Sequence, residues 1–245
     1  EHDFIGIGRN PETSQFTWGN LMASNFEGFT FIHLSQISIN SLTTSSDLRV
    51  HRKQNLAILD EFFKKFESCE KATKFIFISS VKAVTLKPGE VVTELTPREE
   101  NNSVGLLKWE AEDYLLNSIV NADKRIYILR PCMVYGLENK SSLYLLYRFV
   151  KSKLPYPLAA FKNCRSFLSA KNLTYVISEI IERDDIPAGV YNIADDEIYS
   201  TKDLFRLIAS ASNRKVRMLA IPKVVIMTMA DIGSLFGLPF NKQQL

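Results

Sequence analysis

The sequence predicts an α/β protein with a doubly wound parallel sheet, and two observations lead to this fold class. Apolar segments of strand length, at 29–35, 74–80 and 125–131, alternate with segments of helical spacing, as in parallel sheets joined by helices. The strand segments are also continuously apolar instead of alternating between apolar and polar residues. That pattern indicates that both faces of the sheet are buried.

The elements of this sheet follow one another through the first half of the chain. An apolar run at 3–8 is ended by the turn signal Arg-Asn-Pro-Glu. The segment 56–66 places apolar residues on one side of a helix, and a second helix begins at Ser103, before the strand 125–131. The apolar side of the helix 56–66 can either cover its own sheet or pair with a second copy in a homodimer.

The second half alternates less regularly and predicts a smaller lobe. We divide the chain into a core at 1–135 and a lobe at 136–245, parts of which return to the core sheet. The expected elements of the second half are helices at 141–153 and 171–183, a short strand after the proline-rich loop, a strand at 189–196, and a helix capped by Ser200 or Thr201 with Asp203 in its first turn.

Composition excludes several classes of protein. The 245 residues are 46% hydrophobic and 23% charged, and the net charge of +3 comes from 30 basic and 27 acidic residues without a polybasic block, so we expect no nucleic-acid partner. The cysteines Cys69, Cys132 and Cys164 form no ligand cluster, which predicts buried thiols and no metal. The longest apolar run, from Val224, is interrupted by Asp231 and is shorter than the about 20 residues needed to span a bilayer. With no signal peptide, we expect a cytoplasmic protein without a transmembrane segment.

Polar residues follow the predicted strands where ligands bind in such sheets, beyond the carboxyl ends. Hydroxyl groups follow the strands 29–35 and 74–80, and an ammonium group lies on the intervening helix. Capping of a turn or helix is the alternative role of a Ser-Ser pair after a strand. The residues expected at this rim are Ser35, Ser79, Ser80, Lys108, Arg130, Pro131 and Tyr135.

Five segments in order carry a family resemblance: FIFISSVKAV, VGLLKWEAE, YILRPCMVYG, NCRSFLSAKNL and VYNIADDEIYSTKDL. Together they resemble the extended short-chain dehydrogenases/reductases, and most closely the NAD-dependent epimerases/dehydratases of bacterial surface-polysaccharide synthesis, which include UDP-glucose 4-epimerase-like enzymes and 4-keto-sugar-nucleotide reductases. The resemblance implies a Rossmann-like core that binds NAD or NADP and a lobe that covers a UDP-hexose.

The resemblance also implies roles for single residues. Ser80 and Lys108 match the catalytic pair, in which the serine holds the substrate oxygen and the lysine holds the nicotinamide ribose. Arg165 matches an arginine that clamps the sugar-nucleotide diphosphate, which suits a guanidinium fork; a surface loop arginine is the alternative. The implied cofactor contacts are Arg9, Ser35, Asn55, Ser79, Lys108, Pro131 and Tyr135. The alternative role of Asn55 is helix capping or packing. Arg9 favours NADP over NAD as the cofactor, and its alternative role is that of a solvated turn residue.

The chain departs from the family pattern at two places. Val104 occupies the position of the catalytic tyrosine, and a valine cannot carry a proton. Leu107 replaces a small polar residue, and Tyr114 lies on another face of the helix. The glycine-rich turn that meets the pyrophosphate does not precede the first strand, and the nearby Gly-x-Gly-x-x-Pro segment ends in Pro11, which has no N–H to offer.

Two explanations and two functions therefore stay open. The chain is either a fragment of a longer product or has lost its cofactor site. It is either a sugar-nucleotide epimerase, 4-keto reductase or dehydratase with impaired activity, or a non-catalytic binding or regulatory module that keeps the fold. The sequence leaves undecided the sugar, the reaction at C4, the choice of NAD or NADP and the oligomeric state.

Overall fold

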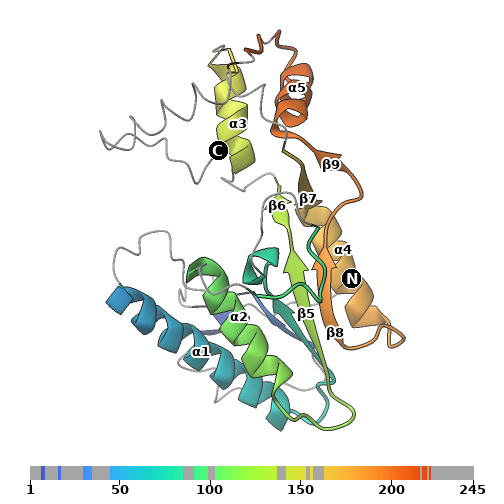
Figure 1. The fold of residues 1–245 in the computed structure, drawn as a ribbon. Coiled ribbons are helices and arrows are strands. Elements are labelled where there is room, and N and C mark those ends of the chain that lie inside the picture. The colour runs from blue at the N-terminus through green and yellow to red at the C-terminus, as the bar shows by residue number, and fades with distance from the viewer. Residues whose placement is uncertain are drawn as a thin grey trace. The chain divides into compact units, whose positions relative to one another are not determined.

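The computed structural model describes residues 7–8, 16–17, 30–34, 45–84, 91–98, 103–136, 142–152, 155–156, 163–215, 217–219 and 221 (Figure 1). In chain order its elements are β1 (Ile7–Gly8), β2 (Phe16–Thr17), β3 (Phe31–His33), α1 (Ser45–Ser68), β4 (Lys74–Ile78), the 3-10 helix η2 (Val81–Ala83), α2 (Ser103–Leu116), β5 (Arg125–Pro131), β6 (Met133–Tyr135), α3 (Ser142–Lys151), β7 (Arg165–Ser169), α4 (Ala170–Glu182), β8 (Gly189–Ile193), β9 (Ile198–Tyr199) and α5 (Thr201–Ala211).

A parallel sheet with the strand order β3-β4-β5-β8 forms the centre of the described structure. The register pairs Phe77 with His33 on one side and with Ile128 on the other, so the strands end at one common edge. Helices α1 and α2 connect these parallel strands (Figure 1). The predicted α/β fold with a parallel Rossmann-like sheet is therefore confirmed. The short strands β1 and β2 pair with each other in a separate parallel sheet.

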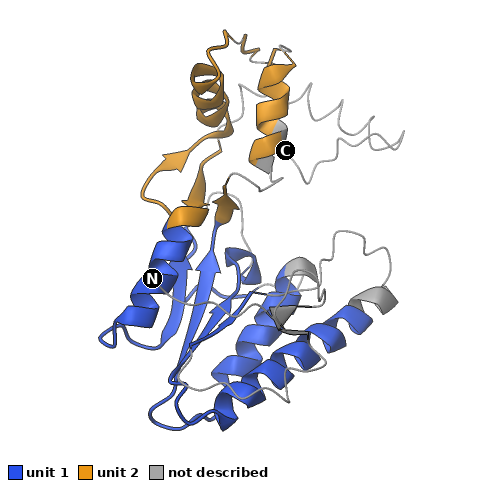
Figure 2. Cartoon of the chain, turned by 180° about the vertical axis from the view of Figure 1, so that it is seen from behind, with its two compact units in different colours: residues 1–132, 172–193 blue, residues 133–171, 194–245 orange. Residues whose placement is uncertain are grey.

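The chain divides into two compact units (Figure 2). The first contains 1–132 and 172–193, and the second contains 133–171 and 194–245. The polypeptide thus enters the second unit after Cys132, returns near the start of α4 and leaves again after β8. The functions assigned above to a core and a lobe stay predictions.

Helix α1 covers one face of the parallel sheet with aromatic side chains. It is longer than the predicted segment 56–66, and its stripe packs into the core of its own unit. Phe63 meets Phe75 of β4 edge-on, with 5.1 Å between the ring centroids. The stripe therefore covers its own sheet, and a homodimer stays a prediction. The largest buried residues of this core include Leu59, Phe63, Phe66, Phe75, Phe77, Leu115 and Ile128.

At the amino end of the sheet, buried lysines cap the ends of two helices. Lys74 Nζ donates to the carbonyls of Ile180, Ile181 and Arg183 at 2.9–3.0 Å and lies 2.9 Å from Asp184 Oδ1. The last carbonyls of a helix have no partner within the helix, so an ammonium group there satisfies them. This arrangement fixes the C-terminus of α4 to the start of β4.

Lys124 performs the same task for α1. Its Nζ donates to the carbonyls of Phe66 and Cys69 at 2.6 and 2.7 Å and lies 4.5 Å from the centroid of the Phe66 ring. Burial lowers the pKa of Lys124, and the neighbouring Cys69 and Glu67 oppose that shift. The ammonium groups of Lys74 and Lys124 are thus both bound to carbonyl groups at the ends of helices and support the fold.

The second unit has a smaller core of its own. Tyr156 and Phe205 of α5 stack with 4.6 Å between ring centroids, and Val150 of α3 is buried with them. Ser200 caps α5, as one of the two predicted alternatives, because its Oγ accepts the Asp203 N–H at 3.1 Å. The prediction of buried thiols is confirmed for Cys69 and wrong for Cys164, which is exposed beside β7, while Cys132 is only partly buried. In the part of the chain that the structure describes, no helix combines the length and the apolar character needed to cross a membrane.

Candidate functional site

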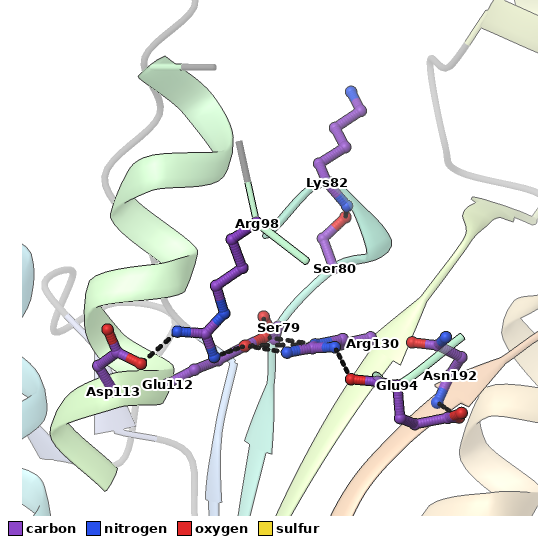
Figure 3. Close-up of polar contacts among 9 residues, drawn as sticks. All are labelled: Ser79, Ser80, Lys82, Glu94, Arg98, Glu112, Asp113, Arg130 and Asn192. Carbon is purple, nitrogen blue, oxygen red and sulfur yellow. Dashed lines mark hydrogen bonds and ion pairs between the residues drawn. The ribbon is translucent and has the colours of Figure 1, made fainter. Parts of the chain in front are cut away.

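The carboxyl end of the parallel sheet holds a buried ion pair between Glu112 of α2 and Arg130 of β5 (Figure 3). Arg130 donates to both carboxylate oxygens, with Nη2 2.6 Å from Oε2 and Nε 3.0 Å from Oε1. Ser79 donates its hydroxyl to Oε1, and Arg98 lies 3.3 Å from Oε2. Because a buried carboxylate is costly without partners, these donors are what allow Glu112 to be completely buried.

The same network reaches the segment 91–98 and the end of β8. Arg130 Nη1 lies 3.4 Å from the carbonyl of Glu94, and the Glu94 carboxylate accepts the Asn192 N–H at 2.7 Å. Hydrogen bonding by Asn192 N–H is the main cause that lowers the pKa of Glu94. Asn192 Nδ2 in turn donates to the carbonyl of Val92 at 3.2 Å. The ends of three strands, one helix and one connecting segment are therefore fixed to one another.

Lys108 lies one turn before Glu112 on α2 and has a different environment. Its Nζ donates to the carbonyl of Ile78, the last residue of β4, at 2.8 Å, and lies 5.1 Å from the centroid of the Phe77 ring. Burial lowers the pKa of Lys108 to about 8, and Glu112 opposes this shift. A small pocket beside Lys108 is lined by His33, Asn55, Leu59, Phe77, Leu107 and Ala111.

His33 ends β3 and brings a second titratable group to this pocket. The imidazole is buried, and its ring centroid lies 5.6 Å from that of Phe77. Burial is the main cause that lowers the pKa of His33 to about 4, and the charge of Lys108 lowers it further. His33 is therefore neutral at pH 7, which keeps a second positive charge away from Lys108.

The hydroxyl groups of Ser79 and Ser80 have different hydrogen-bond partners (Figure 3). Ser79 is bound to the buried Glu112, whereas Ser80 caps the 3-10 helix η2 by accepting the Lys82 N–H at 3.2 Å. Capping, the alternative role considered for a Ser-Ser pair after a strand, is thus observed for Ser80. Its Oγ still has an O–H to donate, so a cap does not prevent it from meeting a ligand.

The other predicted site residues are distributed over both units. Asn55 lines the pocket beside Lys108, and Pro131 is buried at the end of β5. In the second unit, Tyr135 donates its hydroxyl to Asp195 at 3.2 Å, and the exposed Arg165 begins β7. Arg9, Ser35 and the side chain of Val104 lie outside the described residues. None of the roles predicted for these residues is tested by this geometry.

Sequence reasoning missed Glu112, His33 and the pairing of Arg130. A signal existed for two of them. Glu112 follows Ala111 on a helix whose neighbouring positions Leu107 and Leu115 are buried, and Arg130 stands inside a continuously apolar strand. A carboxylate in one buried element and a guanidinium in another predict a buried ion pair, because burying either charge without a partner is costly. No such rule selects His33.

Comparison with known proteins gives a consistent group of relatives, although no family model matches. The chain is 32% identical over 168 residues to UDP-glucose 4-epimerase of Vibrio cholerae, which covers 67% of this chain and 50% of the relative. Among solved structures it resembles UDP-glucuronic acid 4-epimerase from Bacillus cereus in complex with NAD, with a TM-score of 0.64, 20% identity and coverage of 77% of this chain and 61% of that one.

A second solved structure extends this comparison. UDP-N-acetylglucosamine 4-epimerase from Methanobrevibacter ruminantium M1, in complex with UDP-N-acetylmuramic acid, has a TM-score of 0.65 and 16% identity, and the match covers 85% of this chain and 71% of that one. The likeness to solved structures establishes the fold. The chain spans about half the length of the curated relatives it matches, 50% and 45%.

Proposed function

We propose, because this chain belongs to the extended short-chain dehydrogenase/reductase family of sugar-nucleotide epimerases, that it acts as a UDP-hexose 4-epimerase with NAD as cofactor. The observation that carries the proposal is the placement of Lys108. Its amine lies at the carboxyl end of β4, the edge at which open parallel sheets bind nucleotides. The 4-keto reductase and dehydratase reactions of the same lineage, and a role in surface-polysaccharide synthesis, are finer alternatives within it.

The described residues fit a nicotinamide ribose. An ammonium group has three N–H donors, and Lys108 gives one of them to the carbonyl of Ile78. The remaining donors suit the hydroxyls of a ribose, while Asn55 contributes an amide to the same pocket. When bound, NAD would supply the acceptor for a hydride; Lys108 would hold its ribose.

Ser80 is the residue that we assign to the substrate oxygen. Ser79 precedes it, but the bond of Ser79 to Glu112 fixes the turn and commits that hydroxyl to the interior. Ser80 is less buried than Ser79 and keeps an O–H for the hydroxyl or ketone at the sugar C4. We assign Arg165 to the diphosphate, and Pro131 and Tyr135 to the nicotinamide side, on the family pattern alone. The contacts of Arg9, Ser35 and Ser79 with the cofactor, the use of NADP and a homodimer remain expectations of the sequence.

A non-catalytic binding module is the second candidate, and Val104 is the observation that favours it. Without a phenol at position 104 the family's usual proton carrier is missing. Acid–base groups contribute about 10²–10⁴-fold to a rate, so their loss predicts slow turnover more readily than none. The two candidates therefore differ in turnover and agree in ligand binding.

The test uses the full chain with NAD and UDP-glucose, with formation of UDP-galactose followed by proton NMR. The proposal expects slow interconversion of the two sugars, which Lys108→Met abolishes. Lys82→Met is a matched control, because Lys82 lies in η2, two residues after Ser80, and contributes only its backbone N–H to the observed cap. Binding of UDP-glucose without turnover would support the non-catalytic module, and absence of binding by any UDP-hexose would contradict both candidates.

A further inference from the structure

We infer that Lys108 Nζ is itself the group that takes the proton from the substrate hydroxyl and returns it, in addition to holding the cofactor. The inference rests on the proposed function and deepens it. It starts from a gap in the chemistry: position 104, one helical turn before Lys108 on α2, carries a valine, and the buried neighbours Leu107 and Ala111 have no proton to exchange. Among the residues that the structure describes, the candidates for a proton carrier are therefore the other titratable groups of this pocket.

Two titratable groups line the pocket, and their environments distinguish them. His33 is buried at the end of β3, and its imidazole lacks affinity for a proton at pH 7 because its pKa is lowered to about 4. Lys108 is only partly buried and reaches the end of β4 through its bond to Ile78. Of the two, Lys108 is both the more accessible and the one able to hold a proton in the neutral pH range.

The charges that face Lys108 allow it to lose a proton. Glu112 on its own helix favours the ammonium form, but that carboxylate is already bound by Arg130, Ser79 and Arg98. Helix α1 contributes only Asn55 and Leu59 to the pocket, β4 contributes Phe77, and β3 contributes the neutral His33. Among the described residues, no carboxylate therefore forms an ion pair with Lys108. The amine consequently has a neutral fraction near pH 8, as a general base requires.

The proton transfer balances without a further group. NAD, when bound, would supply the acceptor for the hydride that leaves the sugar C4. The hydroxyl O–H bond would break, and its proton would move to the lone pair of neutral Lys108. The C4–O bond becomes a carbonyl, and Lys108 becomes an ammonium. In the return step the Lys108 ammonium would give this proton back to the oxygen, and the reduced cofactor would supply the hydride that C4 regains.

The first readout is independent of turnover. Trace acetylation of the full chain from pH 6 to 11, with each lysine followed by peptide mass spectrometry, reports the pKa of each amine. Lys108 should reach half of its maximal reactivity near pH 8. Lys64 serves as the internal control, because it is exposed and its bond to Asp60 raises its pKa. A Lys108 that titrates together with Lys64 would overturn the inference.

The second readout separates a proton carrier from a fixed cation. Lys108→Arg keeps the positive charge and hydrogen-bond donors but does not release a proton. We expect it to bind NAD and UDP-glucose while 4-epimerisation falls at least about 100-fold. Adding Val104→Tyr to Lys108→Arg supplies a phenol and should raise the rate of 4-epimerisation at least about tenfold over that of Lys108→Arg. Such a gain would show that the arginine substitution leaves the site intact.

The outcomes separate this inference from the proposed function. Activity of Lys108→Arg within a few fold of the unaltered chain overturns the inference, since a fixed cation is then sufficient. The inference also falls if the unaltered chain binds both ligands without turnover, while the assigned binding site stands. Failure to bind either ligand overturns the proposed function itself, whatever the acetylation profile of Lys108.

Discussion

The two ends of the parallel sheet in the first unit hold their lysines in different surroundings. At the amino end, Lys74 and Lys124 are surrounded by carbonyl oxygens that end helices α4 and α1. At the carboxyl end, Lys108 has a single carbonyl, an aromatic ring and a neighbouring imidazole. The number of carbonyl acceptors around the amine thus distinguishes a lysine that supports the fold from one available for chemistry.

The carboxyl end is nevertheless rigidly built around its reactive group. Glu112, one turn beyond Lys108, is held by Arg130, Ser79 and Arg98, and Arg130 also reaches the segment that carries Glu94 (Figure 3). Such a network fixes α2 against β4 and β5. The position of Lys108 is thereby determined by residues that need never touch a ligand.

The largest effect should come from breaking that network. Glu112→Gln leaves the guanidinium of Arg130 buried without its carboxylate, and we expect the free energy of unfolding to fall by about 3–5 kcal/mol. Urea denaturation measures it. Glu110→Gln is the matched control on the same helix: Glu110 pairs with the half-exposed Arg52 and should cost at most about 1 kcal/mol. Equal losses in the free energy of unfolding for the two substitutions would show that the buried pair does not stabilise the fold more than the surface pair does.

The second-largest loss of stability should follow from a substitution at the amino end of the sheet. Lys74→Met removes the donor to three carbonyls, one buried and two partly buried, so we expect a loss of about 2–3 kcal/mol in the free energy of unfolding. The affinity for NAD should not change, because Lys74 lies at the opposite end of β4 from Lys108. A large loss of affinity in a folded Lys74→Met variant would contradict the division between the two ends.

Acid should destabilise the protein through His33. Its pKa is lowered to about 4 in the folded state from 6.5, so the unfolded chain binds more protons between these values and stability is lost as the pH falls through this window. Between pH 7 and 4.5 we expect His33 to account for about 2 kcal/mol of the loss. His33→Gln should reduce the pH dependence by that amount in urea denaturation, and an unchanged dependence would show that the imidazole is not kept neutral.

The smallest effect has the opposite sign. The pKa of Lys108 is lowered to about 8 in the folded state, so below pH 8 its charge costs stability, and stability rises with pH between about 8 and 10.5. We expect Lys108→Met to be more stable by about 1–2 kcal/mol at pH 7, with an advantage that shrinks by pH 10. If Lys108→Met were less stable than the unaltered chain at pH 7, Lys108 would stabilise the fold as Lys74 and Lys124 do.

The sequence predicted the parallel sheet because periodicity and continuous apolar runs depend on local order. It predicted Ser80 and Lys108 at one rim because strands of a parallel sheet end together, whereas Asn55 was implied by the family resemblance. The structure places Asn55 and Lys108 around one pocket. It offered capping as one role of the Ser-Ser pair, but it did not indicate that Ser80 would cap η2 while Ser79 turns inward to Glu112. Such a choice depends on a partner 33 residues away, which no local pattern encodes.

The most direct test of the central claim, that the carboxyl end of the sheet is a ligand site and the amino end is not, is the binding of NADH to the full chain, followed by its fluorescence. We expect saturable binding that Lys108→Met weakens at least about tenfold and Lys74→Met leaves unchanged. Absence of binding, or equal affinity of the Lys108→Met variant and the unaltered chain, would contradict it.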